Sequence, residues 1–205
     1  MANFAAPRGL SPVGTITGAA YNEQGRLYAI SSTDTTNSYA IGDVVVSADG
    51  TDANGVPQVV KYTGTGVPLG IVVGIRVADP GTSLQGTTLA LNQTYLTAGS
   101  AAGRYVFVVD DPNVIFQVQF DATGVTQAQG HLNAALSVTA AQSLTMSSPL
   151  SSVVATAPAT TNTLPIRLLG LAQIPGNGFG GYAVALAKFN IHEFGVGTGT
   201  NFTAV

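Results

Sequence analysis

The stretch RYVFVVDDPNVIFQVQF, residues 104–120, decides the fold of this chain. Two runs rich in valine, isoleucine and aromatic residues flank the pair Asp110–Asp111, and Pro112 follows directly. Such runs are typical of β-strands, whereas Asp-Pro favours a turn. In the second run, every other residue is a large apolar one, which is the two-residue period of a half-buried strand. The stretch therefore predicts two strands that meet at the aspartate pair.

Similar runs recur along the whole chain, each bounded by Gly, Pro, Asn or Asp. No alternation of strands with helices is visible, and the Ala-rich segment 130–144 lacks a 3.6-residue apolar stripe, so we do not expect a helix there. Many short strands separated by turns indicate an all-β fold, a β-sandwich or jelly-roll-like domain over residues 21–195. The strand-like runs are residues 43–48, 57–64, 69–78, 103–111, 113–120, 165–174 and 182–194.

The two ends differ in composition from the middle. Residues 1–20 carry two prolines and isolated apolar side chains, which cannot form a core by themselves and predict an extended N-terminal arm. This arm either frays or becomes ordered against a neighbour, and residues 196–205 have the composition of a flexible tail. If the arm binds a partner, its expected contacts are Phe4, Arg8, Leu10 and Val13.

Composition excludes several classes of function. Charged residues make up only 8% of the 205 residues, against about 25% in ordinary soluble domains. The seven Lys and Arg are scattered, so there is no basic stripe for direct nucleic-acid binding, and no apolar run is long enough to span a membrane. Cysteine is absent, which rules out disulfides and Cys-ligated zinc. So little charge indicates either a surface covered by partners or one rich in Ser, Thr and Asn.

Motifs for chemistry are weak. GNGFGG (176–181) matches the spacing of a dinucleotide loop, but a strand-like run follows it where a helix is required, so a hairpin turn is the better interpretation. DGTDANG (49–55) lacks the ligands of a calcium loop, and His131 and His192 show no metal-ligand spacing. We therefore expect no cofactor, no metal and no enzymatic activity.

The aspartate pair itself has a structural explanation. Adjacent strand residues point to opposite faces, so Asp110 and Asp111 cannot cooperate as a close carboxylate pair unless the strand breaks. Pro112 predicts such a break, with one aspartate capping the turn and the other buried against an arginine. Arg167, alone in an apolar run, is the candidate partner. A brace of this kind is favoured over a catalytic acid.

The order of several segments resembles a known family. VVDDPNVIFQVQFDATG, GHLNA, LPIRLLGL, GNGFGG and VALAKFNIHEFG follow one another between residues 104 and 195. This order is similar to that in head proteins of tailed bacteriophages described as capsid cement or decoration proteins. The resemblance implies a jelly-roll-like homodimer or homotrimer that binds the outer surface of the major capsid protein lattice in the virion, after assembly in the host cytoplasm. It also implies structural roles for Asp110, Asp111, Pro112, Phe116, Gln119, Arg167, Asn190 and His192.

Two other functions stay open. A tail or baseplate β-module with a host-binding role would also have a Gly-, Thr- and Asn-rich surface of low charge. A hydrolase would have to use Asp110 or Asp111 together with His192.

Overall fold

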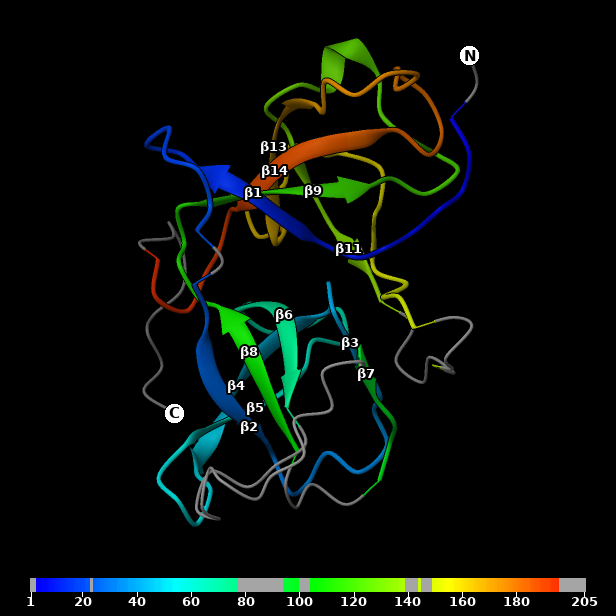
Figure 1. Cartoon of the computed structure of the whole chain (residues 1–205). Coiled ribbons are helices and arrows are strands. Elements are labelled where there is room, and N and C mark those ends of the chain that lie inside the picture. The colour runs from blue at the N-terminus through cyan, green and yellow to red at the C-terminus, as the bar shows by residue number, and fades with distance from the viewer. Residues whose placement is uncertain are drawn as a thin grey trace.

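A computed structural model describes residues 3–22, 24–76, 94–99, 104–138, 144 and 149–195 of the chain. Those residues form strands and one short 3₁₀ helix, η1 (Gln127–Gln129), which confirms the all-β, sandwich-like prediction. Figure 1 shows two halves stacked on one another, a sheet half that holds the N-terminus and a barrel half below it. The predicted tail, residues 196–205, lies outside the described residues.

The barrel half is a closed five-stranded barrel. Around it the order is β2 (Arg26–Ile30), β5 (Pro57–Lys61), β4 (Val44–Thr51), β6 (Gly70–Arg76) and β8 (Tyr105–Val109). Only β2 and β5 run parallel, and the remaining pairs are antiparallel. The closure is short at two places, because β4 pairs with β6 only at Val44 and Val45, and β2 pairs with β5 only at Ala29 and Ile30.

A short two-stranded sheet adds to the barrel half. It consists of β3 (Tyr39–Ala40) and β7 (Tyr95–Leu96), which pair antiparallel. Both contribute to the barrel core, because Tyr39 and Leu96 are buried in the same apolar cluster as Val45 and Val72.

The sheet half contains a five-stranded antiparallel sheet. Its order is β1 (Ser11–Thr15), β9 (Val114–Gln119), β14 (Val184–Phe189), β13 (Ile166–Leu171) and β10 (Asn133–Ala134). A second small sheet pairs β11 (Leu136–Ser137) with β12 (Val154–Ala155). Strands β13 and β14 form a hairpin, and the glycine-rich run 176–181 lies in its loop.

The stretch that predicts two strands joins the two halves. Strand β8 ends in the barrel at Val109, and β9 begins in the sheet at Val114. The turn at residues 110–113 therefore carries the chain from one half to the other.

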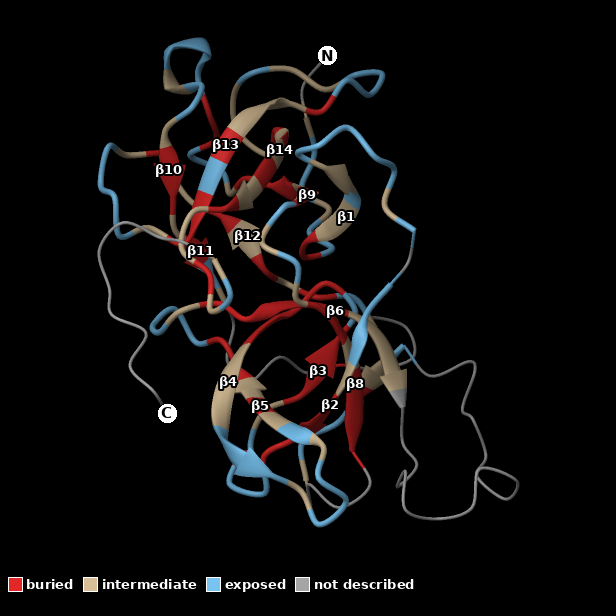
Figure 2. Ribbon diagram, turned by 90° about the vertical axis from the view of Figure 1, so that its left-hand side faces the viewer, coloured by how far each residue is buried: buried red, intermediate tan, exposed pale blue. Residues whose placement is uncertain are grey.

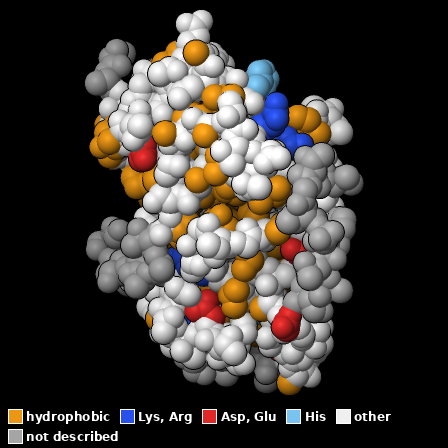
Figure 3. All heavy atoms as spheres, turned by 180° about the vertical axis from the view of Figure 1, so that it is seen from behind, with side chains coloured by type: hydrophobic (Ala, Val, Ile, Leu, Met, Phe, Trp, Pro, Cys, Tyr) orange, Lys and Arg blue, Asp and Glu red, His pale blue; other side chains and the backbone are white. Residues whose placement is uncertain are grey.

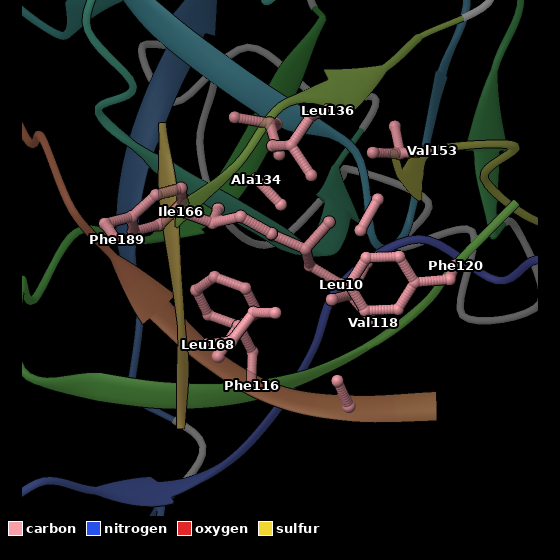
Figure 4. Packing of buried hydrophobic residues seen from close by; sticks show 14 of the residues in the cluster. Leu10, Phe116, Val118, Phe120, Ala134, Leu136, Val153, Ile166, Leu168 and Phe189 are labelled. Atoms are coloured by element: carbon pink, nitrogen blue, oxygen red, sulfur yellow. The ribbon is translucent and has the colours of Figure 1, made fainter. Parts of the chain in front are cut away.

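One face of the five-stranded sheet is packed into the core. Its inward residues include Phe116, Phe120, Ile166 and Phe189, which Figure 4 shows converging between the strands, and the Phe116 and Phe189 rings lie 5.0 Å apart. The cluster also holds Val44, Tyr62 and Ile71 from the barrel half, so one apolar core is shared by both halves. Figure 2 shows this burial as a continuous band from the sheet into the barrel.

The N-terminal arm is ordered on its own chain. Residues 11–15 form β1 at the sheet edge, and Leu10 is 1% exposed within the shared core. Leu10 is therefore a core residue and is not open to a partner, which corrects its assignment as a surface contact. The sequence missed this because two prolines and isolated apolar residues are typical of both an arm and an edge strand.

Candidate interaction surface

The second face of the five-stranded sheet mixes apolar with polar side chains and is not packed into the core. We call it the outer sheet face, and its residues are half-buried except Arg167, which is exposed. In β14 the small residues Ala185 and Ala187 point to the core, whereas the larger Val184 and Leu186 point outward. The largest residue of β14, Phe189, is in the core, so only the middle of the strand has this arrangement. Half-buried apolar side chains on a sheet face are typical of a surface that contacts something else. The outer sheet face comprises Ile115, Gln117, Arg167, Val184, Leu186 and Lys188.

The arm crosses one end of this face and is held there by Gln119. The Gln119 side-chain amide donates to the carbonyls of Phe4 and Tyr182, both at 3.0 Å, and its oxygen accepts from the Ala6 backbone N–H at 2.8 Å. Asn3 extends the attachment, because its side chain donates to the carbonyls of residues 178 and 181 in the hairpin loop. Polar bonds thus hold residues 3–6 of the arm on the sheet, and the Phe4 side chain remains exposed.

A cavity and an apolar rim lie where the arm meets the sheet. The cavity has a volume of about 290 Å³ and is lined by the arm from Asn3 to Gly9, by Gln117, Val184 and the hairpin loop. Two lining residues, Phe4 (77% exposed) and Ile174, are large apolar side chains open to solvent, and Phe179 of the same hairpin loop is 53% exposed outside the cavity lining. Such large apolar side chains around a hollow are typical of protein contact sites.

Of the other proposed arm contacts, Arg8 lines the same cavity and is exposed, and Val13 is exposed at the bulge where β1 pairs with β9.

The aspartate pair lies at a second hollow, a wide groove at the junction of the two halves. Asp110 accepts a hydrogen bond from the Tyr28 hydroxyl at 2.7 Å and forms an ion pair with Arg26 at 3.4 Å. Arg26 is therefore the arginine beside the pair, and Arg167 is not, because Arg167 points outward from β13. Asp111 caps the turn by accepting from the Asn113 backbone N–H at 2.8 Å. The groove, of about 1050 Å³, is open and also lined by Thr15 and other polar residues.

Two further residues with implied structural roles hold loops. Asn190 donates from its side-chain amide to the carbonyls of Asn162 and Leu164, at 2.7 and 2.9 Å, which fixes the loop before β13. Pro112 follows Asp111 in the turn between β8 and β9, close enough to Gly195 that a Cβ added there would lie 3.4 Å from the Pro112 Cβ.

His192 is buried close to the aspartate pair, which the hydrolase hypothesis requires, but its chemistry is that of a core residue. Its ring stacks near Phe189 and Phe194, and its Nδ1 accepts from the Phe194 backbone N–H at 3.0 Å. Burial lowers its pKa from 6.5 to about 4, and the nearby charges of Asp110 and Asp111 offset this only in part. His192 is therefore neutral at pH 7, and its Nε2 has no hydrogen-bond partner.

The depressed pKa of His192 predicts acid sensitivity. The unfolded chain binds a proton at this residue below about pH 6.5, but the folded chain does so only near pH 4, so folding stability falls as the pH drops through that window. We expect this residue to contribute roughly 2–3 kcal/mol to the loss of unfolding free energy between pH 7 and pH 4. Urea unfolding at several pH values measures it. His192→Phe should flatten the profile, whereas His131→Asn at an exposed left-handed position should not.

A buried polar network inside the barrel was not predicted from the sequence. Lys61 and Asp43 form an ion pair at 2.9 Å with both side chains fully buried. Asp43 also accepts from the Ser151 hydroxyl, which belongs to the sheet half. The two-residue period of a strand could have identified Lys61 as buried, since it lies two residues from the buried Val59 in β5 and therefore points to the same face.

A second set of buried polar residues lies in the same half as the Lys61–Asp43 ion pair. Arg104 donates to the carbonyls of Asp34, Asn37 and Gly99 and lies 5.5 Å above the Tyr39 ring. Burial lowers the pKa of Arg104 and raises that of Tyr39, whose hydroxyl donates to the Asp34 carboxylate. These charges serve the barrel core and are not exposed to a substrate.

The described residues were also compared with the requirements of a metal site and of a membrane-spanning helix. Among them, no group of three His, Asp or Glu side chains is placed to hold a metal ion. No helix in the described ranges is long and apolar enough to cross a bilayer. No family model matches the chain, and neither a curated protein nor a solved structure is significantly similar to it.

Proposed function

We propose that this protein is a structural component of a bacteriophage virion that binds the outer surface of the major capsid protein lattice and stabilises the head. The proposal rests on the resemblance in segment order and on one structural observation above all. That observation is the outer sheet face, which carries the half-buried apolar side chains Ile115, Val184 and Leu186 beside an arm with an exposed Phe4.

The chain's unusual charge distribution supports the same function. Among its few charged residues, Asp34, Asp43, Lys61 and Arg104 are buried inside the molecule. The surface is therefore even poorer in charge than the composition indicates. Surface charge keeps soluble proteins apart, so a surface that lacks it suits a molecule that works within an assembly.

Such a protein would act by burying surface area against the capsid subunits. A standard protein interface buries about 1,600 Å² in total, and simultaneous contact with two or more capsid subunits slows dissociation strongly. Because it would bind the assembled lattice and not the separated subunits, mass action would stabilise the shell. In this mechanism the arm residue Phe4 and the sheet residue Leu186 contribute apolar contact, and Gln119 holds the arm in position.

The test uses DNA-free heads of the phage that carries the gene, prepared without this protein. Purified chain should cosediment with these heads, saturate, and raise the temperature at which they rupture. Phe4→Ser should weaken binding roughly tenfold or more, because truncated anchor residues cost over 1 kcal/mol. Phe194→Ser is the matched control, since this exposed phenylalanine lies next to His192 and away from the arm.

The variant Gln119→Ala tests whether binding to the heads requires the arm to be held in its position on the sheet. Loss of its three bonds should free residues 3–6 and weaken binding to the heads, while a thermal melt reports whether the sheet itself is intact. Equal binding by the Phe4 and Phe194 variants would contradict the role of the arm. Failure of the wild-type chain to bind heads, or its detection on tails by electron microscopy, would overturn the proposed function.

A further inference from the structure

Two cations stand directly opposite each other on the outer sheet face. In the register of β13 and β14, Arg167 pairs with Lys188, so both side chains project from the same face. Like charges in directly opposed positions destabilise an antiparallel pair. A chain with only seven Lys and Arg has therefore placed two of them where they repel each other.

Nothing in the described part of the chain neutralises this pair. The ion pairs there are Arg26 with Asp110 and Lys61 with Asp43, and neither involves Arg167 or Lys188. Figure 3 shows Lys and Arg side chains gathered on the sheet half, with the acidic side chains of that view standing apart from them. The repulsion is thus uncompensated within the described residues of the isolated molecule, and an anionic group from outside would relieve it.

The surroundings of the pair define what kind of anion fits. Leu186 lies on the same face two residues from Lys188, and Ile115 lies on the neighbouring strand β9, both half-buried. A nucleic-acid backbone needs a stripe of cations for its successive phosphates, which two residues beside apolar side chains do not provide. Carboxylates set in an apolar protein surface match both features.

We infer that the outer sheet face docks onto an acidic protein surface, with carboxylates of the partner placed opposite Arg167 and Lys188. This inference rests on the proposed function and specifies the chemistry of the capsid surface that the protein meets. Complementary charges at such a position set the association rate and the register of docking. The apolar residues beside them supply contact area.

The inference is tested by binding to the same DNA-free heads at low and high salt. For the wild-type chain, binding should weaken as salt rises, because the charges attract across a partly exposed rim. The double variant Arg167→Gln/Lys188→Gln should bind roughly tenfold more weakly at low salt and lose most of the salt dependence. Arg26→Gln is the matched control, because it removes one exposed cation at the groove beside Asp110.

A second measurement needs no partner. Removal of the repulsion should leave the thermal midpoint of Arg167→Gln/Lys188→Gln equal to that of the wild type or a few degrees higher, so weaker binding would not reflect unfolding. Unchanged affinity and salt dependence in the double variant would overturn the inference while leaving the proposed function intact. Equal loss in the Arg26 control, or self-association through this face that blocks binding to heads, would overturn it as well.

Discussion

Replacing Lys61 with methionine is expected to lower the free energy of unfolding by about 3–5 kcal/mol. The Lys61 ammonium lies 2.9 Å from Asp43, and neither side chain has any exposed surface. Methionine fills a similar volume but leaves the Asp43 carboxylate buried without its counter-charge. Urea unfolding followed by circular dichroism measures the change.

The double variant Lys61→Met/Asp43→Asn is the control for this prediction. With the carboxylate neutralised, no uncompensated charge remains, and an asparagine at position 43 still accepts from the Ala40 backbone N–H or the Ser151 hydroxyl. We therefore expect the double variant to be clearly more stable than Lys61→Met alone. A single variant that costs less than about 1 kcal/mol, or that equals the double, would show that the ion pair does not stabilise the barrel.

The buried network around Asp43 also helps to hold the two halves together, which composition alone does not predict. Ser151 belongs to the loop before β12, in the sheet half, whereas Asp43 precedes β4 of the barrel. The bond from Ser151 to Asp43, at 2.5 Å and fully buried, thus ties the two halves by a polar contact beside the shared apolar core. Removal of the Asp43 side chain should therefore loosen both halves together.

Strand content could be predicted from the sequence, but strand partners could not. The runs around residues 105–109 and 114–119 are strands because β-branched and aromatic residues alternate there between turn residues. Their partners lie far away in sequence, as when β8 pairs with β2 some eighty residues earlier. Non-local pairing depends on the whole chain and leaves no local signal, so the closed barrel could not be distinguished from a sandwich.

The two-residue period of the strands explains why the predicted partner of the aspartate pair was wrong. Arg167 stands between the buried Ile166 and Leu168, so the two-residue period already directs it outward and away from Asp110. The same period directs Lys61 inward beside Val59. Applied to each charged residue, this rule separates the outer cations from the buried network. The arm bonds of Gln119 have no such signal, because they depend on where residues 3–6 lie in space.

The second large effect is expected at Gly9, where the arm meets the barrel. Gly9 has a φ of +73°, and a Cβ there would lie 2.3 Å from the Gly42 carbonyl oxygen and 2.7 Å from the Ser151 Cβ. The next residue, Leu10, donates from its backbone to the same Gly42 carbonyl at 2.9 Å. Backbone of the arm, the turn before β4 and the Ser151 loop therefore touch at one point, which only glycine permits.

Gly9→Ala should consequently lower the free energy of unfolding by more than about 2 kcal/mol, because left-handed strain and a clash with backbone add together. Gly18→Ala isolates the first of these costs, since Gly18 has a φ of +88° but no atom within 4 Å of the added Cβ. We expect that control to lose only about 1 kcal/mol. Unfolding in urea compares the two, and binding to DNA-free heads should fall for Gly9→Ala and persist for Gly18→Ala. If both variants behave alike, the close approach at Gly9 does not position the arm.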